Sequence, residues 1–201
     1  MVRPEFPYSL LGMVHLANHV TQHRPLHLGE AFDVTARVLD FGPHHAGTTV
    51  RIEASAAVGR EVVWLGVSTY LAKGAGTGPR AERATFTAPT PTGRWVLPGD
   101  VGRRYAAVSG DRNPIHTNVL AANALGFPRT IAHWMYTASR ALAAAAGLRT
   151  DAFTWEVEFA RPVVVPGTVA VRVAPDDDGV ALAVWSPRSG KPHLTGRVAP
   201  A

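Results

Sequence analysis

The first third of the chain alternates apolar and polar residues with a period of two. Residues 32–38 alternate in this way, residues 50–56 do so again, and residues 62–71 form a third, continuously apolar segment. The GPHHAG segment at residues 42–47 supplies a turn between the first two. This pattern predicts antiparallel strands. Residues 10–23 fit both a helical face and a strand, so the pattern alone leaves that segment undecided.

The pattern changes in the second half of the chain. After an opening segment at 95–100 it predicts short helices around 101–108 and near 118–125. An alanine-rich helix then runs from Ile131 to Ala146 and ends at Gly147. Four strands are predicted to follow, near residues 152–161, 168–175, 180–186 and 193–198. One central helix with an antiparallel sheet is an α+β arrangement.

A segment rich in Gly, Pro, Thr and Ala, residues 74–93, has no hydrophobic period and is predicted to be a linker. It separates a first part, residues 1–73, from a second part, residues 94–201. A sheet with an apolar face and no helix of its own must bury that face. The first part is therefore expected to pack on the second part, on another copy of the chain or on a different chain.

Composition places the chain among ordinary globular proteins, with 201 residues, 46% hydrophobic and 17% charged. It has no cysteine, which excludes disulfides and thiolate metal sites. No apolar run approaches the ~20 residues of a membrane span, and the first twenty residues do not resemble a signal peptide. We therefore expect no membrane association and a cytoplasmic location.

The charge is basic, with a net value of +5 and a pI of about 10.2. Eighteen arginines are scattered singly, and only Arg103 and Arg104 are adjacent. No aromatic residues are interleaved with a basic cluster, so nucleic-acid binding is not expected. Scattered arginines suit either a small polyanionic ligand or a solvated basic surface.

The segment YAAVSGDRNPIH, residues 105–116, carries the candidate chemistry. Gly110 permits a sharp turn before Asp111, and the Asn113-Pro114 pair directs His116 back toward it. A carboxylate and an imidazole that share one water can together handle both protons of a hydration. The alternative is structural: Asp111 caps a helix and His116 is a buried, hydrogen-bonded residue.

The start of the long helix adds a second element. Backbone N–H groups near His133 to Met135 have no partner within the helix and lie at the positive end of its dipole. A thioester carbonyl placed there would have its developing enolate stabilised. Residues 141–146 are all alanine or leucine and are expected to pack against the sheet.

These segments resemble the MaoC-type, R-specific enoyl-CoA hydratases, the hydratase 2 family. The shared motifs are SGDRNPIH, the following Gly126-Phe127 pair, and Ile-Ala-His-x-Met at residues 131–135. That family has the hotdog fold, a long central helix wrapped by an antiparallel sheet. The resemblance covers residues 94–201, including FARPVVVPGTV at 159–169, and implies a complete C-terminal hotdog domain there.

The N-terminal segment PYSLLGMVHLANHVTQHRPLHLGE, residues 7–30, is similar to a strand of double-hotdog members of the family. In those proteins the strand follows the helix of the N-terminal half. The similarity implies that residues 10–23 form a strand and that residues 1–73 form a partial N-terminal hotdog-like sheet, mostly strands.

The resemblance also implies a reaction and a set of site residues. Asp111 and His116 correspond to the catalytic pair, without deciding which is the base. Trp134, beside His133, corresponds to the residue whose N–H binds the thioester oxygen. The residues expected to support the turn are Tyr105, Ser109, Gly110 and Asn113.

The implied reaction is reversible syn hydration of a trans-2-enoyl thioester to the (R)-3-hydroxyacyl product. It requires no metal and no redox cofactor, since coenzyme A or acyl carrier protein is part of the substrate. A homodimer, or a heteromer with another hotdog chain, is expected.

One position departs from the family, which has glycine where this chain has Trp134. The indole adds on the order of 200 Å² of surface, and it either fills the acyl pocket or points into a subunit interface. The departure suggests an alternative function: a non-catalytic or repurposed hotdog subunit. Such a subunit would bind a partner or an acyl ligand, or serve another elimination or cyclisation in a biosynthetic pathway.

Three further patterns are expected to be structural. His15, His19, His23 and His27 recur every four residues, which on one face of a strand separates neighbours by ~13 Å, too far for one metal ion. Residues 176–179, Asp-Asp-Asp-Gly, are typical of a hairpin turn. The core or an interface is expected to hold Trp64, Trp95, Trp155 and Trp185.

Overall fold

The structure is a computed structural model that describes residues 6–9, 12–80 and 85–201. Residues 10 and 11 of the predicted strand, and residues 81–84 of the predicted linker, lie outside the described residues. Within the described part, no helix is both long and apolar enough to cross a membrane.

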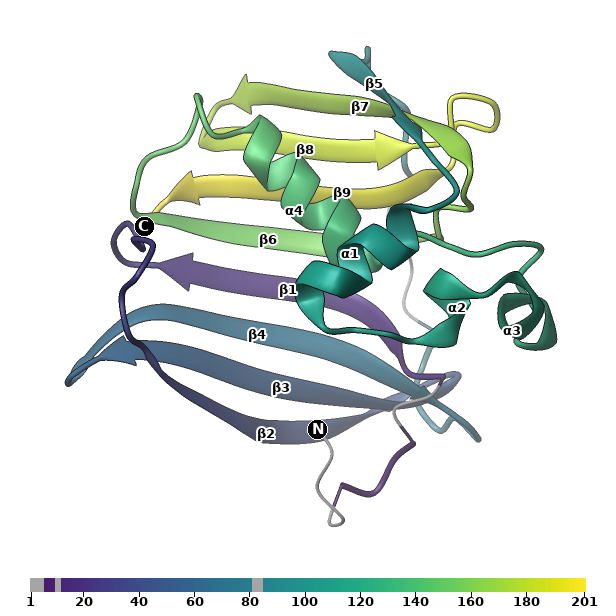
Figure 1. Ribbon diagram of the computed structural model, residues 1–201, viewed down its shortest axis with the longest axis horizontal. Helices are drawn as coiled ribbons and strands as arrows, with labels where there is room; N and C mark the ends of the chain where they lie inside the picture. Colours follow the sequence, from purple (N-terminus) through teal and green to yellow (C-terminus); the bar gives the residue numbers. More distant parts are fainter. Residues whose placement is uncertain (1–5, 10–11, 81–84) are drawn as a thin grey trace. The chain divides into compact units, whose positions relative to one another are not determined.

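The chain divides into two compact units, each built on antiparallel strands (Figure 1). Unit 1 combines the N-terminal part with two short returns of the chain, residues 1–84, 150–156 and 199–201. Unit 2 holds the remainder, residues 85–149 and 157–198. Strand β6 (Phe153–Phe159) is divided between the units, with residues 153–156 in unit 1 and residues 157–159 in unit 2.

Unit 1 confirms the predicted strands. Their order is β2-β3-β4-β1, with antiparallel pairing throughout. They are β1 (Val14–Gln22), β2 (Asp33–His44), β3 (Gly47–Val58) and β4 (Glu61–Lys73). The undecided segment is thus a strand over residues 14–22. The turn predicted at residues 42–47 is tighter than expected, because β2 continues to His44 and β3 begins at Gly47.

The register of β2 on β3 gives that pair of strands one apolar and one charged face. Val34 lies opposite Ala56, and Val38 lies opposite Ile52. The charged face carries two ion pairs, Arg37 with Glu53 at 2.7 Å and Arg51 with Asp40 at 2.9 Å. Val34 remains 73% exposed. The period of two in the sequence is therefore the alternation of these faces.

The expectation that the regularly spaced histidines share one face of a strand is wrong. A β-bulge between His15 and Ala17 shifts the register, so His15 pairs with Tyr70 and His19 pairs with Val67, three residues away on β4. His15 is buried and stacks on the Tyr70 ring at 4.4 Å. The His19 imidazole instead lies 2.9 Å from the Glu156 carboxylate. An extra residue in a strand reverses the faces of those beyond it.

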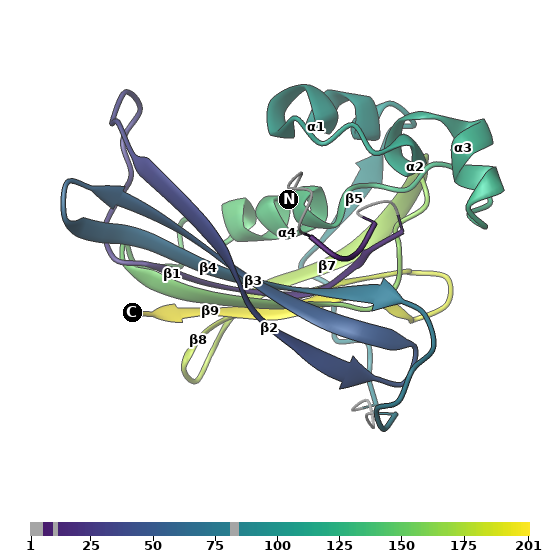
Figure 2. The same cartoon turned by 90° about the horizontal axis from the view of Figure 1, so that it is seen from below.

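Unit 2 is a central helix on an antiparallel sheet, as the hotdog resemblance implies (Figures 1 and 2). The end of β6 is followed in the sheet by β9, β8, β7 and β5. The strands are β5 (Gly93–Leu97), β7 (Gly167–Asp176), β8 (Gly179–Trp185) and β9 (Pro192–Pro200). The helices are α1 (Val101–Ser109), α2 (Pro114–Thr117), α3 (Val119–Ala124) and α4 (Trp134–Ala144).

Helix α4 buries a stripe of small residues, Thr137, Ala138 and Ala141, on the side that contacts β8. Small side chains at this spacing let a helix approach a sheet closely. Helices α1, α2 and α3 lie on the same side of the unit 2 sheet as α4, with α2 and α3 near the ends of β5 and β7 (Figure 2).

The predicted bounds of the long helix are wrong at both ends. It begins at Trp134 rather than Ile131, because Ile131 is extended and forms a β-bridge with Val164. It ends at Ala144 with Ala145 as its C-cap, so Gly147 does not end it. Helix α2 was predicted only as a turn.

The expected hairpin turn is confirmed, and the expected core positions are confirmed for two of the four tryptophans, since Trp64 and Trp95 are only half-buried. Asp176 pairs with Gly179 across the β7–β8 hairpin. Trp155 and Trp185 are buried core residues, and Phe86 packs against the cluster that contains Trp185.

Unfolding of the protein should depend on pH through His15. Burial lowers the pKa of His15 from 6.5 to about 4, partly offset by a hydrogen bond with the Ala17 backbone. As pH falls from about 6.5 to about 4, the unfolded chain binds a proton that the folded chain does not, so stability falls. The free energy of unfolding should fall by about 3 kcal/mol over this pH range because of His15.

Thermal unfolding midpoints between pH 7 and pH 4 would measure this loss. His15→Asn should make the decline shallower, whereas the same substitution at the exposed His23 should leave it unchanged. An equal decline in both variants would refute the assignment to His15.

Candidate active site

The candidate carboxylate follows directly on the end of α1. Gly110 adopts a left-handed conformation with φ of 74°, and its N–H donates to the Ala106 carbonyl at 3.0 Å. This closes the helix and turns the chain out of it. The N–H of Asp111 then donates to Ser109 Oγ at 3.2 Å. Glycine and serine thus set the direction in which the Asp111 side chain leaves the backbone.

Asn113 organises the next turn. Its N–H donates to Asp111 Oδ1 at 3.1 Å, its own Oδ1 accepts from the Ile115 N–H at 3.3 Å, and its carbonyl accepts from the His116 N–H at 3.0 Å. Asn113 is therefore the N-cap of α2. This contradicts the first part of the structural alternative, in which Asp111 caps the helix. Its second part is confirmed, because His116 is buried and hydrogen-bonded.

His116 is buried, with 5% of its surface exposed. Its Nδ1 lies 2.9 Å from the Ile131 carbonyl oxygen. Because a carbonyl only accepts, Nδ1 carries the hydrogen and the Nε2 of the neutral ring keeps its lone pair. Burial lowers the pKa of His116 to about 4; the Ile131 bond and Asp111 raise it, and His133 lowers it further. His116 is thus a neutral imidazole at neutral pH.

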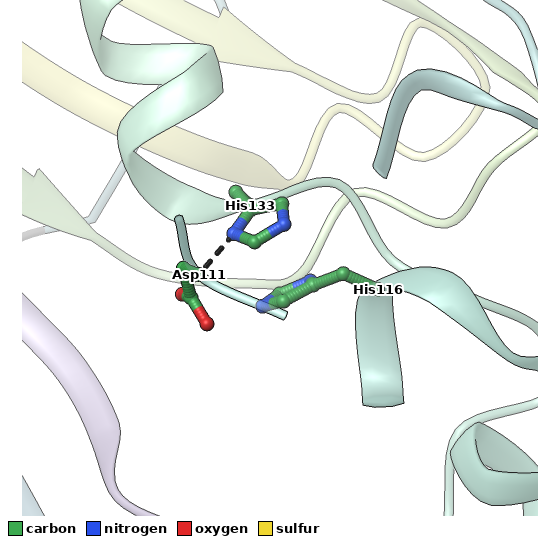
Figure 3. Close-up of side chains that lie close together, drawn as sticks. All are labelled: Asp111, His116 and His133. Atoms are coloured by element: carbon green, nitrogen blue, oxygen red, sulfur yellow. Dashed lines mark ion pairs between the residues drawn. The ribbon is translucent and has the colours of Figure 1, made fainter. Parts of the chain in front are cut away.

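His133 contacts both members of the predicted catalytic pair. Its Nδ1 is 3.3 Å from Asp111 Oδ2, and its ring stacks on that of His116 with centroids 3.6 Å apart (Figure 3). Tyr105 contacts the His133 ring at 5.0 Å. Burial lowers the pKa of His133, against the opposing effects of Asp111 and the Gly102 backbone. Two buried imidazoles in contact are both favoured in the neutral form.

The three side chains converge, as Figure 3 shows. One oxygen of Asp111 and one nitrogen each of His116 and His133 lie within 4.8 Å of one another. The Asp111 side chain is 56% exposed, while the imidazoles are buried. A polar molecule arriving from solvent would therefore meet the carboxylate first and the imidazoles behind it.

The start of α4 completes the arrangement. Trp134 is its first residue, and the first turn closes with the Thr137 N–H donating to the His133 carbonyl at 3.3 Å. In the described part of the chain, no side chain caps this end of the helix. The N–H of Trp134 has no partner within the helix. The half-buried indole packs against the Phe159 ring, 5.4 Å away between centroids.

An extended stretch holds α4 in place relative to α2. The Ile131 N–H donates to the Ile115 carbonyl at 3.1 Å. On the other side of the stretch, the Ala132 N–H donates to the Val163 carbonyl at 2.8 Å, and the Val165 N–H donates to the Thr130 carbonyl at 3.0 Å. His133 follows at once, so its position is set by these long-range backbone bonds.

Sequence reasoning missed several residues on which the site depends. Gly102 is one, because a Cβ there would lie 1.9 Å from the His116 carbonyl oxygen. The sequence did contain a sign of this, because a glycine within a helix destabilises it by about 1 kcal/mol relative to alanine and therefore suggests a packing constraint. Phe159 and the Ile131 carbonyl carried no such signal.

A central helix packed on an antiparallel sheet, with a carboxylate and two imidazoles near the helix start, is the arrangement that the hotdog resemblance implies. The MaoC like domain matches residues 73–181, more than half of the chain. The chain belongs to the MaoC-like domain family.

Individual relatives agree with that assignment. The 3-hydroxyacyl-thioester dehydratase X of Mycobacterium tuberculosis is 38% identical over 200 residues, which are 96% of this chain and 71% of that protein. The crystal structure of HtdX from the same organism superimposes with a TM-score of 0.87 at 37% identity, covering 98% of this chain and 80% of the other.

A MaoC-like dehydratase from Phytophthora capsici shares the fold at 18% identity. Its TM-score is 0.78, and the match covers 96% of this chain and 73% of the other.

Gly102→Ala should disrupt the contact between α1 and α2. The added methyl group collides with backbone, which cannot rotate away, so we expect a loss of about 1–3 kcal/mol in the free energy of unfolding and a displaced His116. Denaturant unfolding measures the first effect. Gly147→Ala is the matched control, because a Cβ there meets nothing within 4 Å. Equal stability of the two variants would contradict the close packing.

Proposed function

We propose that this protein is a 3-hydroxyacyl-thioester dehydratase, which catalyses the reversible syn hydration of a trans-2-enoyl thioester to the (R)-3-hydroxyacyl product. The thioester is that of coenzyme A or acyl carrier protein, and the proposed chemistry uses no metal and no redox cofactor. We also propose that the protein works as a homodimer or with another hotdog chain. Family membership and the name of the 38% identical relative support the reaction class.

The observation that carries the proposal is the state of His116. The Ile131 carbonyl holds its Nδ1 hydrogen, and burial lowers its pKa to about 4. Its Nε2 is therefore an unprotonated base at neutral pH, beside an exposed carboxylate. We assign the role of base to His116 and the role of holding the water to Asp111.

In the hydration direction, one hydrogen of the water is accepted by Asp111 as a hydrogen bond. His116 Nε2 removes the other proton as the water oxygen bonds to the β-carbon. The C=C electron pair moves toward the carbonyl, giving an enolate. The imidazolium, whose low pKa makes it a strong acid, then returns the proton to the α-carbon. Because one group serves both carbons, oxygen and hydrogen add to the same face.

The enolate oxygen requires a donor that is present before the reaction begins. The N–H of Trp134 has this character, because it has no partner in the helix and lies at the positive end of the α4 dipole. It stands one residue from His133, whose side chain contacts both Asp111 and His116. We therefore propose that the thioester carbonyl oxygen accepts a hydrogen bond from this N–H.

One observation favours the second candidate, a non-catalytic or repurposed hotdog subunit. A tryptophan stands at position 134, where the resembling family has glycine. In that case Asp111 and His116 would be retained without hydratase turnover. The indole lies against Phe159, which belongs to β6. Direct assay separates the two candidates.

Purified protein, with EDTA present, should remove the enoyl-thioester absorbance of crotonyl-CoA or of longer trans-2-enoyl-CoA substrates. Asp111→Asn and His116→Ala should each lower kcat by about 10²–10⁴-fold. Asp177→Asn, at an exposed hairpin position, is the matched control and should have no effect. Absence of turnover at every chain length, alone and with partner hotdog chains, would reject the hydratase and favour the second candidate.

Trp134→Pro should remove the proposed oxyanion donor with little change in the fold. Proline is favoured at the first position of a helix, and His133, at φ −59° and ψ 140°, has the conformation that a residue before proline prefers. We expect kcat to fall by about 10²–10³-fold.

Trp134→Ala is the control for this variant, because it removes the indole and keeps the N–H. It should retain kcat, or raise it if the indole obstructs the acyl chain. Equal loss in both variants would assign the effect to the side chain and contradict the backbone donor.

A further inference from the structure

The Asp111 carboxylate is not confined by packing. Its side chain is 56% exposed, yet each of its oxygens lies close to one nitrogen. Oδ1 accepts from the Asn113 N–H at 3.1 Å, and Oδ2 lies 3.3 Å from His133 Nδ1 (Figure 3). A single donor would leave the carboxylate free to rotate about that bond. A second donor, at the other oxygen, would determine the plane of the carboxylate.

His133 is itself held rigidly. It is 3% exposed. Its ring stacks on that of His116, with centroids 3.6 Å apart and planes at 25°. It also contacts the Tyr105 ring, with centroids 5.0 Å apart and planes at 57°. Its backbone follows the Ala132–Val163 hydrogen bond, and its carbonyl begins α4. The direction of its Nδ1 is therefore set by the fold, so it can impose that direction on a partner.

We propose that His133 is a positioning residue: its neutral imidazole, protonated on Nδ1, donates to Asp111 Oδ2 and holds the carboxylate in the plane that orients the reacting water. The proposal rests on the hydratase function proposed above. A carboxylate oxygen only accepts, so the neutral ring must carry its hydrogen on Nδ1 to make this contact.

Because His133 is neutral, its proposed role is to orient Asp111 rather than to stabilise a charge. Burial lowers the pKa of His133, and the neighbouring His116 ring is also neutral at neutral pH. A second cation 3.6 Å from the His116 ring would oppose formation of the imidazolium during turnover. A neutral donor orients Asp111 without that repulsion. Its loss should therefore change kcat, with little change in KM.

Two amide substitutions separate the two ring nitrogens. His133→Asn can place an N–H near the position of Nδ1, whereas His133→Gln places it nearer Nε2. With an enoyl-CoA substrate, we expect His133→Gln to lower kcat about 100-fold at a nearly unchanged KM, the scale expected when a reacting group is misplaced by about 1 Å. His133→Asn should stay within about tenfold of the wild type.

His193→Asn is the matched control. His193 lies on β9, and its Nδ1 contacts a backbone carbonyl, that of Arg161 at 3.1 Å, rather than a carboxylate. This variant should keep both kcat and KM. Wild-type kcat in His133→Gln, equal losses in the Asn and Gln variants, or a rise in KM without a fall in kcat would each overturn the positioning role.

A measurement without turnover keeps the two proposals distinguishable. Nitrogen-15 NMR of the imidazoles should show the Nδ1-protonated tautomer for His133 in the wild type, and Asp111→Ala should abolish that preference. The Nε2-protonated tautomer in the wild type would refute the contact even if the enzyme is active. An inactive wild type with the expected tautomer would instead refute the hydratase function alone.

Discussion

The backbone of Ile131 is the constraint on which the site depends. Its N–H donates to the Ile115 carbonyl at 3.1 Å, and its carbonyl accepts from His116 Nδ1 at 2.9 Å. One residue thus joins α2 to the segment that leads into α4. The second of these bonds also selects the tautomer of His116. Two residues later comes His133, so the same stretch places both imidazoles.

Burial then determines what these imidazoles can do. A buried cation without full compensation is costly, so the pKa of His116 is lowered to about 4 and that of His133 is lowered as well. The exposed Asp111 carboxylate is the charged partner nearest to both. The site is therefore a pair of stacked imidazoles behind one carboxylate, and one of the rings is hydrogen-bonded to the Ile131 carbonyl. A lowered pKa keeps His116 unprotonated at neutral pH and makes its conjugate acid strong, which fits the proposed role of a base that returns its proton within the same turnover.

The sequence predicted those parts of the molecule that depend on local order. The strands of unit 1 followed from alternation, because the two sheet faces differ in polarity, and SGDRNPIH identified Asp111 and His116 as neighbours across a short turn. The start of α4 was misplaced because the partner of Ile131 is Val164, 33 residues further along the chain. Local periodicity cannot detect such a bond. The bulge beside His15 likewise has no local signature.

The contact between His133 and Asp111 illustrates the same limit within the site. The motif that contains His133 pointed to the backbone N–H of the following residue, and nothing in its spacing linked the imidazole to a carboxylate 22 positions earlier. That link required α1, α2 and the stretch before α4 to be assembled first. Gly102 carried part of the information, because only a residue without Cβ allows α1 to meet the His116 carbonyl.

Trp134 is compatible with this assembly for a reason of backbone geometry. A residue at the first position of a helix has ordinary helical dihedral angles, so glycine is not required there for conformational freedom. What tryptophan adds is volume, and its indole is placed against Phe159 on β6. The N–H stays at the helix end whichever side chain is present. The side chain at position 134 can therefore change without loss of the N–H that we propose binds the thioester oxygen.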